Sequence, residues 1–85
     1  PFINSQLSVY PNPFSTQTTV KSDKILINKM LKIYNSYGQL VKQISDISLQ
    51  MTTLYRDDLP SGFYLLQLTK DDKLIETKKI LITDK

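Results

Sequence analysis

The chain has 85 residues, and its 11 basic and 8 acidic side chains give a formal net charge of +3. It contains no Cys and no His, which excludes disulfides, a Cys nucleophile, a Ser-His-Asp triad and a typical zinc site. A chain of this length forms one small domain, and its longest apolar run, Phe63 to Leu66, is too short to span a bilayer.

The basic residues indicate a solvated surface rather than a nucleic-acid site. All of them are Lys except Arg56, and they are spread along the chain with one adjacent pair, Lys78 and Lys79. Nucleic-acid binders cluster such residues and favour Arg, because its planar fork fits phosphates and bases. We therefore expect no nucleic-acid partner.

Apolar residues alternate with polar ones along most of the chain, which predicts strands rather than helices. Segment 24–28 is ambiguous, because it either extends a strand or forms a connecting loop. The predicted strands are 7–10, 17–22, 30–35, 39–45, 48–55, 63–69 and 74–82. Short strands at roughly ten-residue spacing predict an all-β fold, an antiparallel immunoglobulin-like β-sandwich.

The alternation also predicts which side chains share a face, because successive residues of a strand point to opposite sides. In and just before the strand at 48–55, one face is expected to carry Ile47, Leu49, Met51, Thr53 and Tyr55. In the other strands the residues expected on one face are Thr18 with Val20, Leu31 with Ile33, Tyr64 with Leu66 and Leu68, and Ile80 with Ile82. Phe63, Leu65 and Gln67 are expected on the face opposite to Tyr64.

Turn-forming residues separate these strands. Pro11-Asn12-Pro13 lacks backbone N–H donors at two positions and marks a break. Residues 35–38 predict a hairpin turn with Gly38 at a positive φ, and residues 59–62 predict a second turn. Residues 70–73 predict a polar hairpin tip.

The run from Leu59 to Tyr64 predicts a pinned corner between two sheets. Tyr64 stands at the start of a strand, where a corner tyrosine of a sandwich donates a hydrogen bond to backbone upstream of it. Gly62 is expected at a backbone angle that a Cβ disfavours. Tyr64 is therefore interpreted as a structural residue rather than a ligand-stacking one.

Four segments occur in an order that resembles a known family. They are Val9 to Pro13 (V-Y-P-N-P), Ile33 to Val41 (I-Y-N-S-Y-G-Q-L-V), Leu59 to Tyr64 (L-P-S-G-F-Y) and Lys78 to Ile82 (K-K-I-L-I). Over nearly the whole chain this order resembles the C-terminal sorting domain of the type IX (Por) secretion system of Bacteroidetes-type bacteria. The sequence departs from the family pattern at Gln39, where Arg is common, and at Asn35, where Asp is common. The sorting-motif residues implied by the resemblance are Pro11, Asn12, Pro13, Gly38, Leu40, Val41, Leu59, Pro60, Gly62, Tyr64, Lys78, Lys79, Ile80, Ile82 and Lys85.

The resemblance implies a secretion signal rather than a catalyst. Residues 1–6 would be a linker remnant from an upstream cargo domain in the same chain, and residues 7–85 would be the sorting domain. Its partners would be the type IX translocon, an outer-membrane shuttle and a sortase-like peptidase that removes it. The cargo would pass through the periplasm and reach the cell surface or the medium. Catalytic residues, cofactors and metals are not expected.

The predicted last strand, at 74–82, suggests how such a signal is recognised. A terminal strand at a sheet edge has free N–H and C=O groups that can pair with a receptor, or with a second copy in a weak homodimer. Lys78, Lys79 and Lys85 flank or enter this strand, where charge also discourages promiscuous pairing. The alternative is that Ile80 and Ile82 only fill the core and the lysines only solubilise the protein.

Two other classes of function compete with this interpretation. An adhesive or carbohydrate-binding sandwich would use an aromatic platform, for which the candidates are Tyr10, Tyr34, Tyr37 and Tyr55. An enzyme would use paired carboxylates, for which the candidates are Asp57 with Asp58 and Asp71 with Asp72. Neighbouring carboxylates in turns are usually just solvated, so we expect no enzyme activity.

Overall fold

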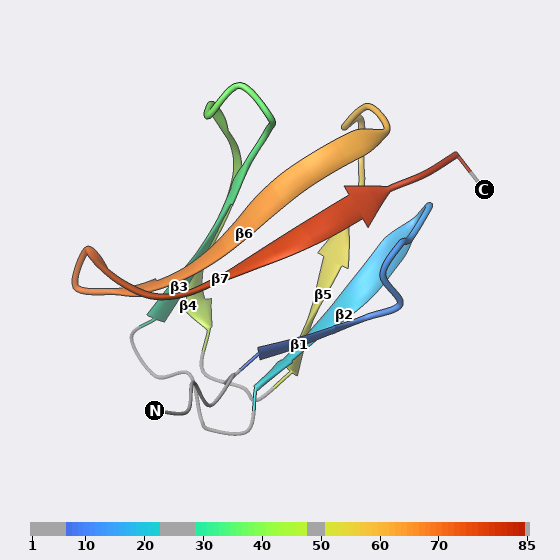
Figure 1. Cartoon of the computed structure of the whole chain (residues 1–85). Coiled ribbons are helices and arrows are strands. Elements are labelled where there is room, and N and C mark those ends of the chain that lie inside the picture. Colours follow the sequence, from blue (N-terminus) through green and yellow to red (C-terminus); the bar gives the residue numbers. More distant parts are fainter. Residues whose placement is uncertain (1–6, 23–28, 48–50, 85) are drawn as a thin grey trace, which may run out of the picture.

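The computed structural model describes residues 7–22, 29–47 and 51–84, and every regular element in these ranges is a β-strand (Figure 1). Segment 24–28, the first residues of the strand predicted at 48–55, and Lys85 lie outside the described residues. The strands are β1 (Leu7–Tyr10), β2 (Gln17–Ser22), β3 (Lys29–Tyr34), β4 (Leu40–Ile47), β5 (Met51–Tyr55), β6 (Gly62–Lys70) and β7 (Lys73–Ile82). The predicted strands are therefore confirmed to within a few residues.

The strands form two antiparallel sheets packed face to face (Figure 1). One sheet has the order β1-β2-β5, and the other has the order β4-β3-β6-β7. Two pairs of consecutive strands form hairpins, β3 with β4 and β6 with β7. Strands β3 and β6 also pair, although they are not consecutive in the sequence. This is the predicted all-β sandwich. Among the described residues there is no helix long and apolar enough to cross a membrane.

The core lies between the sheets and, outside β5, uses the faces that alternation predicts. Thr18 and Val20 of β2 are buried, as are alternate residues of β3, β6 and β7. The buried apolar residues of the core are Leu7, Phe14, Val20, Leu31, Ile33, Leu54, Tyr64, Leu66, Leu68, Ile80 and Ile82. Phe63 and Leu65 lie on the opposite face of β6 and are exposed, as predicted.

The apolar face predicted for β5 is wrong. Met51 and Tyr55 are exposed, and Leu54 is the buried residue of this strand. The pairing with β2 explains the difference, because Leu54 lies opposite Thr18, whose side chain faces the core. Directly paired residues share a face of the sheet, so the inward residues of β2 decide which residues of β5 point inward.

Candidate functional site

Asn12 joins the turn after β1 to the outer edge of β7, the edge that faces away from β6. Its Nδ2 donates a hydrogen bond to the Lys79 carbonyl at 3.1 Å, and its Oδ1 accepts one from the Leu81 N–H at 3.0 Å. A side-chain amide carries the same donor and acceptor as a peptide group. Asn12 therefore pairs with β7 as a neighbouring strand would.

Phe14 continues this pairing toward the chain end. Its N–H donates to the Leu81 carbonyl at 3.1 Å, and its carbonyl accepts from the Thr83 N–H at 2.9 Å. The Phe14 side chain is buried in the core, so the segment is anchored as well as paired. β7 is an edge strand of its sheet, as predicted. The prediction of a free backbone edge is wrong from Lys79 to Thr83, because residues 12–14 already occupy it.

The turn at 11–13 is held from the opposite side by β2. Thr18 is fully buried, and its Oγ1 donates a hydrogen bond to the Pro11 carbonyl at 2.6 Å. A buried hydroxyl needs a hydrogen-bond partner, and the Pro11 carbonyl is that partner. The turn is thus bonded to β2 through Pro11 and to β7 through Asn12.

Arg56 holds Thr83 and Asp84, which follow β7, a role that the sequence did not reveal. Its Nε donates to the Leu59 carbonyl at 2.8 Å, and its Nη1 donates to the carbonyls of Ser15 at 3.2 Å and Thr83 at 3.0 Å. Its Nη2 pairs with Asp84 Oδ1 at 2.9 Å. One guanidinium therefore connects the turn before β2, the turn after β5 and the end of β7, which only a branched donor such as Arg can do.

The hydrogen bonds of the Arg56 guanidinium, here called the clamp, change the pKa of the Asp84 carboxyl. Its side-chain hydrogen bonds with Arg56 and Ser61 lower the pKa of the Asp84 carboxyl from the ordinary value of 3.8. The positive charge of Arg56 acts in the same direction, and slight desolvation acts against it. The carboxylate is therefore the favoured form in the folded domain.

The hairpin between β3 and β4 is the predicted one. Gly38 has a φ of +82°, and its N–H donates to the Asn35 carbonyl at 3.0 Å. The Asn35 side chain accepts from the N–H groups of Tyr37 at 2.9 Å and Gln39 at 3.0 Å, and its Nδ2 donates to Gln39 Oε1 at 2.8 Å. The two residues that depart from the family pattern therefore bond each other.

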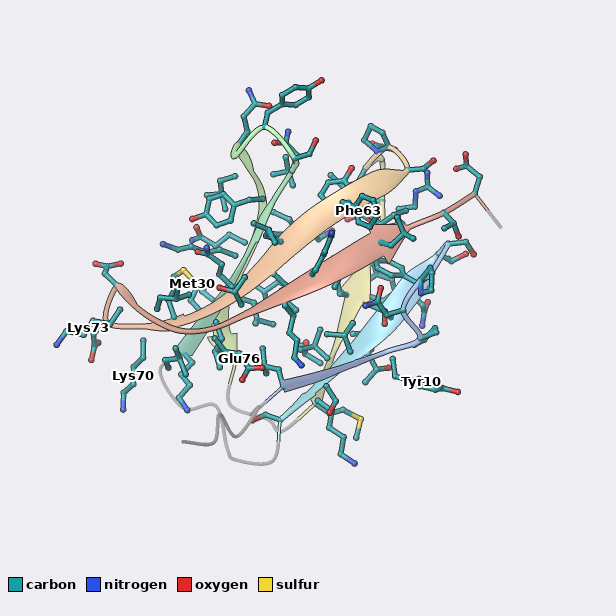
Figure 2. The ribbon with its side chains drawn as sticks, in the orientation of Figure 1. Tyr10, Met30, Phe63, Lys70, Lys73 and Glu76 are labelled. Carbon is teal, nitrogen blue, oxygen red and sulfur yellow. The ribbon has the colours of Figure 1, made fainter. Side chains whose placement is uncertain are left out.

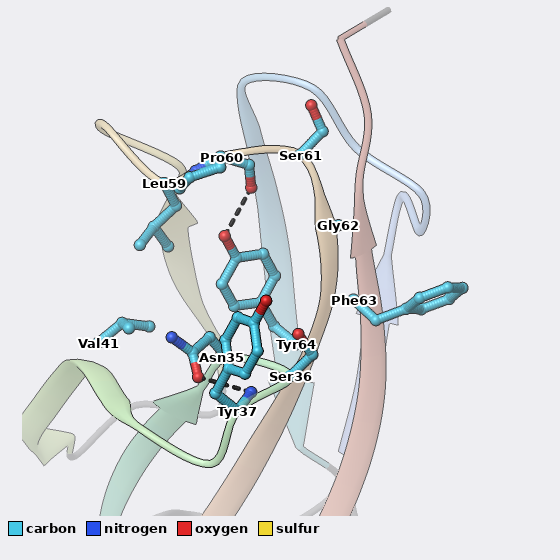
Figure 3. Close-up of a pocket in the computed structure, with 10 residues that line it drawn as sticks. All are labelled: Asn35, Ser36, Tyr37, Val41, Leu59, Pro60, Ser61, Gly62, Phe63 and Tyr64. Atoms are coloured by element: carbon cyan, nitrogen blue, oxygen red, sulfur yellow. Dashed lines mark hydrogen bonds between the residues drawn. The ribbon is translucent and has the colours of Figure 1, made fainter.

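The corner before β6 is also the predicted one (Figure 3). The Tyr64 hydroxyl donates a hydrogen bond to the Pro60 carbonyl at 2.6 Å, and its ring is buried. Gly62 has a φ of +147°, which L side chains rarely adopt. The predicted structural role of Tyr64 and the special backbone of Gly62 are both confirmed.

The hairpin at 35–38 and the turn at 59–62 lie on the two sides of a pocket of about 320 Å³, here called the corner pocket (Figure 3). A second hollow of about 250 Å³, here called the side pocket, lies beside Phe63 on the outer face of β6. The corner pocket is lined by Asn35, Ser36, Tyr37, Val41, Leu59, Pro60, Ser61, Gly62, Phe63 and Tyr64. The side pocket is lined by Asn35, Ser36, Gly38, Phe63, Tyr64, Leu65 and Lys79.

Lys78 and Lys79 lie on opposite faces of β7. Lys79 pairs with Leu65 across the sheet, and its Nζ lies 4.3 Å from the centre of the Phe63 ring. Lys78 shares its face with buried Ile80, and its Nζ lies 3.7 Å from Glu76 Oε2. The adjacent lysines are therefore two separate features rather than one basic patch.

The other sorting-motif residues divide between core and surface. Ile80 and Ile82 are each 1% exposed, and Val41 and Leu59 pack against the core from its margin. Leu40 and Pro60 are exposed. The buried members, Tyr64, Ile80 and Ile82, therefore build the core, while the exposed members remain accessible to a partner.

The candidates of the competing interpretations are dispersed. Tyr10 and Tyr55 belong to the three-stranded sheet, whereas Tyr34 and Tyr37 belong to β3 and its hairpin, so the four rings form no common platform. Asp57 pairs with Lys42. Asp71 and Asp72 both have positive φ in the two-residue turn between β6 and β7.

Comparison with known proteins identifies the family to which this arrangement belongs. Residues 8–83 match the family described as the secretion system C-terminal sorting domain. The chain belongs to this family. The match covers all four motif segments and every strand from β1 to β7 in whole or in part. No curated protein matches the chain.

A solved structure supports the fold of this sorting domain. The chain is similar to PorZ of Porphyromonas gingivalis, described as an essential bacterial surface component of the type IX secretion system. The TM-score is 0.72 at 16% sequence identity, over 91% of this chain and 11% of PorZ. The sorting domain thus corresponds to a small part of that much longer protein. The predicted family and the predicted sandwich fold are both confirmed.

Proposed function

We propose that this sorting domain directs a cargo, encoded upstream in the same chain, through the type IX outer-membrane translocon. The family match over residues 8–83 carries this proposal, because sorting is the property that defines the family. The domain acts by being bound and not by catalysis. The cargo crosses the periplasm and is then displayed on the surface or released.

The folded domain, rather than a linear peptide, is the signal in this proposal. Asn12, Gly62, Tyr64, Ile80 and Ile82 hold the fold through hydrogen bonds, backbone angle or burial. The side chains of Tyr64, Ile80 and Ile82 are buried, so a receptor that contacted them directly would have to unfold the domain. Their recurrence as a motif is explained if the receptor recognises the surface that they support.

Removal by a sortase-like peptidase belongs to the same proposal. We place the cut in the segment before β1, at or near residues 1–6. Leu7 is buried and β1 is paired with β2 along its length, so cleavage within β1 would disrupt the core. A peptidase acting before Leu7 would leave the sorting domain intact and the cargo free.

Pairing of the β7 edge with a receptor strand or a second copy has a structural cost. Residues 12–14 would have to leave the edge between Lys79 and Thr83, breaking four hydrogen bonds. We therefore propose that an exposed face of the domain is recognised, and that a homodimer through this part of β7 does not form while residues 12–14 remain in place.

The proposal is tested by necessity in a bacterium with a working type IX system. A reporter enzyme is expressed with an N-terminal export signal and this chain at its C-terminus, and compared with the same reporter without residues 7–85. The intact fusion should appear outside the cells, and the shortened one should remain in the periplasm. Equal secretion of both would overturn the proposal.

Deletion of the tail alone is a weaker test. Removing residues 78–85 deletes Ile80 and Ile82, which are both buried. Losing two buried aliphatic side chains costs roughly 3–6 kcal/mol, comparable to the whole stability of a small domain. Failed export of such a variant would therefore not distinguish an unfolded domain from a missing receptor contact.

A further inference from the structure

We propose that the outer face of β6 and β7 around Phe63 is the docking surface for a protein segment that combines an apolar side chain with carboxylates. This inference rests on the proposed sorting function, because the partner would be a component of the export machinery. The docking surface is defined as Phe63, Leu65 and Lys79 together with the side pocket.

The docking surface has exposed apolar groups where a sheet face normally carries polar ones. Phe63 is 52% exposed and Leu65 is 41% exposed, although Phe63 is paired with β7 and Leu65 is paired with both β3 and β7. Figure 3 shows Phe63 projecting from the side of β6 opposite to Tyr64. The side pocket of about 250 Å³ lies beside the ring, so an apolar side chain of a partner has both a wall and a space to enter.

The charge around this face selects an acidic partner. Cross-strand pairing aligns Tyr34, Leu65 and Lys79 in one row and Lys32, Gln67 and Thr77 in the next. Directly paired residues share a face, so these two rows contain two lysines and no carboxylate. The charged side chains that a carboxylate approaching Phe63 would meet in these two rows are therefore both positive.

Lys79 is held in the position that such a carboxylate would need. Its Nζ lies 4.3 Å from the Phe63 ring centre, a cation–π distance that keeps the ammonium over the aromatic surface. A Lys ammonium has three N–H donors, and the ring face does not occupy all of them. The ammonium can therefore still donate to a partner carboxylate. An apolar residue on Phe63 and a neighbouring carboxylate on Lys79 would thus be bound together.

A second copy of this chain is a poor occupant of the same face. Two copies meeting face to face through Phe63 would bring Lys32 and Lys79 of each toward lysines of the other, and like charges at an interface are unfavourable. The backbone edge of β7 beside this face is also occupied by residues 12–14 from Lys79 to Thr83. A partner of opposite charge, lying across the face, fits both facts.

The two adjacent lysines provide a matched test. Lys79→Glu reverses a charge on the docking surface, whereas Lys78→Glu makes the same change on the other face of the same strand. Both variants are made in the reporter fusion, and the 85-residue chain with each change is melted to verify folding. Export should fall about tenfold for Lys79→Glu, because a like charge would face the acidic partner, and should change less than twofold for Lys78→Glu.

A second pair tests the apolar part without changing charge. Phe63→Thr removes the exposed ring from β6, and Tyr10→Thr removes a more exposed ring from β1 on the other sheet (Figure 2). Export should fall for Phe63→Thr and not for Tyr10→Thr. A photo-crosslinking residue at position 63, and not at position 10, should form an adduct with a type IX component.

The outcomes separate this inference from the function on which it rests. If deletion of residues 7–85 blocks export while folded Lys79→Glu and Phe63→Thr are exported normally, the docking surface is wrong and the sorting function stands. If deletion of residues 7–85 leaves export unchanged, both the sorting function and the docking surface are wrong. Equal loss of export for Lys78→Glu and Lys79→Glu, with both folded, would also overturn the docking surface.

Discussion

The side-chain amide of Asn12 forms hydrogen bonds with the backbone of β7 on both sides of Ile80, through the Lys79 carbonyl and the Leu81 N–H. A residue near the start of the domain therefore closes the edge of its last strand. An open edge strand invites pairing with other chains, and a secreted domain meets many. The same contact fixes the strand that carries Ile80 and Lys79, so it also supports the docking surface.

Replacing Asn12 by Asp tests this closure. Asp keeps an acceptor for the Leu81 N–H but, when ionised, loses the donor and places a carboxylate against the Lys79 carbonyl. We expect a loss of about 0.5–1.5 kcal/mol in the free energy of unfolding near pH 7. Urea denaturation measures it, and replacement of the exposed Gln43 of β4 by Ala is a control expected within about 0.5 kcal/mol. An unchanged denaturation midpoint for Asn12→Asp would mean that the amide does not hold β7.

Replacing Gly62 tests the backbone requirement of the corner. The φ of +147° disfavours any L side chain, yet a Cβ built there meets no atom within 4 Å. Gly62→Val should therefore destabilise the domain by about 1–3 kcal/mol through the backbone angle rather than through a clash. Gly62→Ala should also destabilise it, which thermal melts can check. A neutral Ala variant beside a damaging Val variant would indicate a steric cause instead.

Local patterns predicted the strands and turns, because each depends on a few neighbouring residues. The hydrogen bond from Tyr64 to upstream backbone was predicted, and its acceptor, the Pro60 carbonyl, lies only four positions away. The contacts of Asn12 with β7 span 67 and 69 positions, and no local rule indicates them. The sequence placed Asn12 in a turn but could not show that its amide faces the last strand.

The wrong face of β5 and the missed role of Arg56 have a similar origin. Met51 and Tyr55 are apolar, so alternation favoured them over Leu54 as core residues, but pairing with Thr18 of β2 turned Leu54 inward. Arg56 is surrounded in sequence by Tyr55 and Asp57, which give no sign that its guanidinium contacts Ser15 and Thr83. Such long-range contacts were available only from the structure.

Arg56→Lys tests the clamp while keeping the charge. A single ammonium cannot reach the carbonyls of Leu59, Ser15 and Thr83 together with Asp84. We expect a loss of about 1–3 kcal/mol in the free energy of unfolding. Denaturation measures the loss, with the exposed Lys21→Ala as the control. Wild-type stability of the Lys variant would show that charge alone is sufficient.

The clamp also predicts a pH dependence. The folded-state pKa of Asp84 is lowered, chiefly by its hydrogen bond with Arg56, so its stabilising contribution is present above the ordinary pKa of 3.8. That contribution is lost as the pH falls through the lowered pKa. Carboxyl NMR titration should show the Asp84 pKa below 3.8 in the folded wild type and closer to 3.8 in Arg56→Lys. An Asp84 pKa at or above 3.8 in the wild type contradicts the clamp.

The turn between β6 and β7 offers a stabilising change. Asp71 and Asp72 have φ values of 52° and 64°, the combination found in type I′ hairpin turns. Gly is preferred at the second of these positions, so Asp72→Gly should raise the stability by about 0.5–1 kcal/mol. Asp71→Gly should give a smaller gain, because Asp is already favoured at the first position. A destabilised Asp72→Gly variant in thermal melts would argue against this turn geometry.

Sufficiency is the most direct test of the sorting function. A reporter enzyme that normally stays in the periplasm is joined to the start of this chain and expressed in two strains, one with a working type IX translocon and one without it. Reporter activity is measured outside the cells. The sorting function predicts extracellular activity only in the strain with the translocon. Periplasmic retention of a folded, stable fusion in both strains would contradict it.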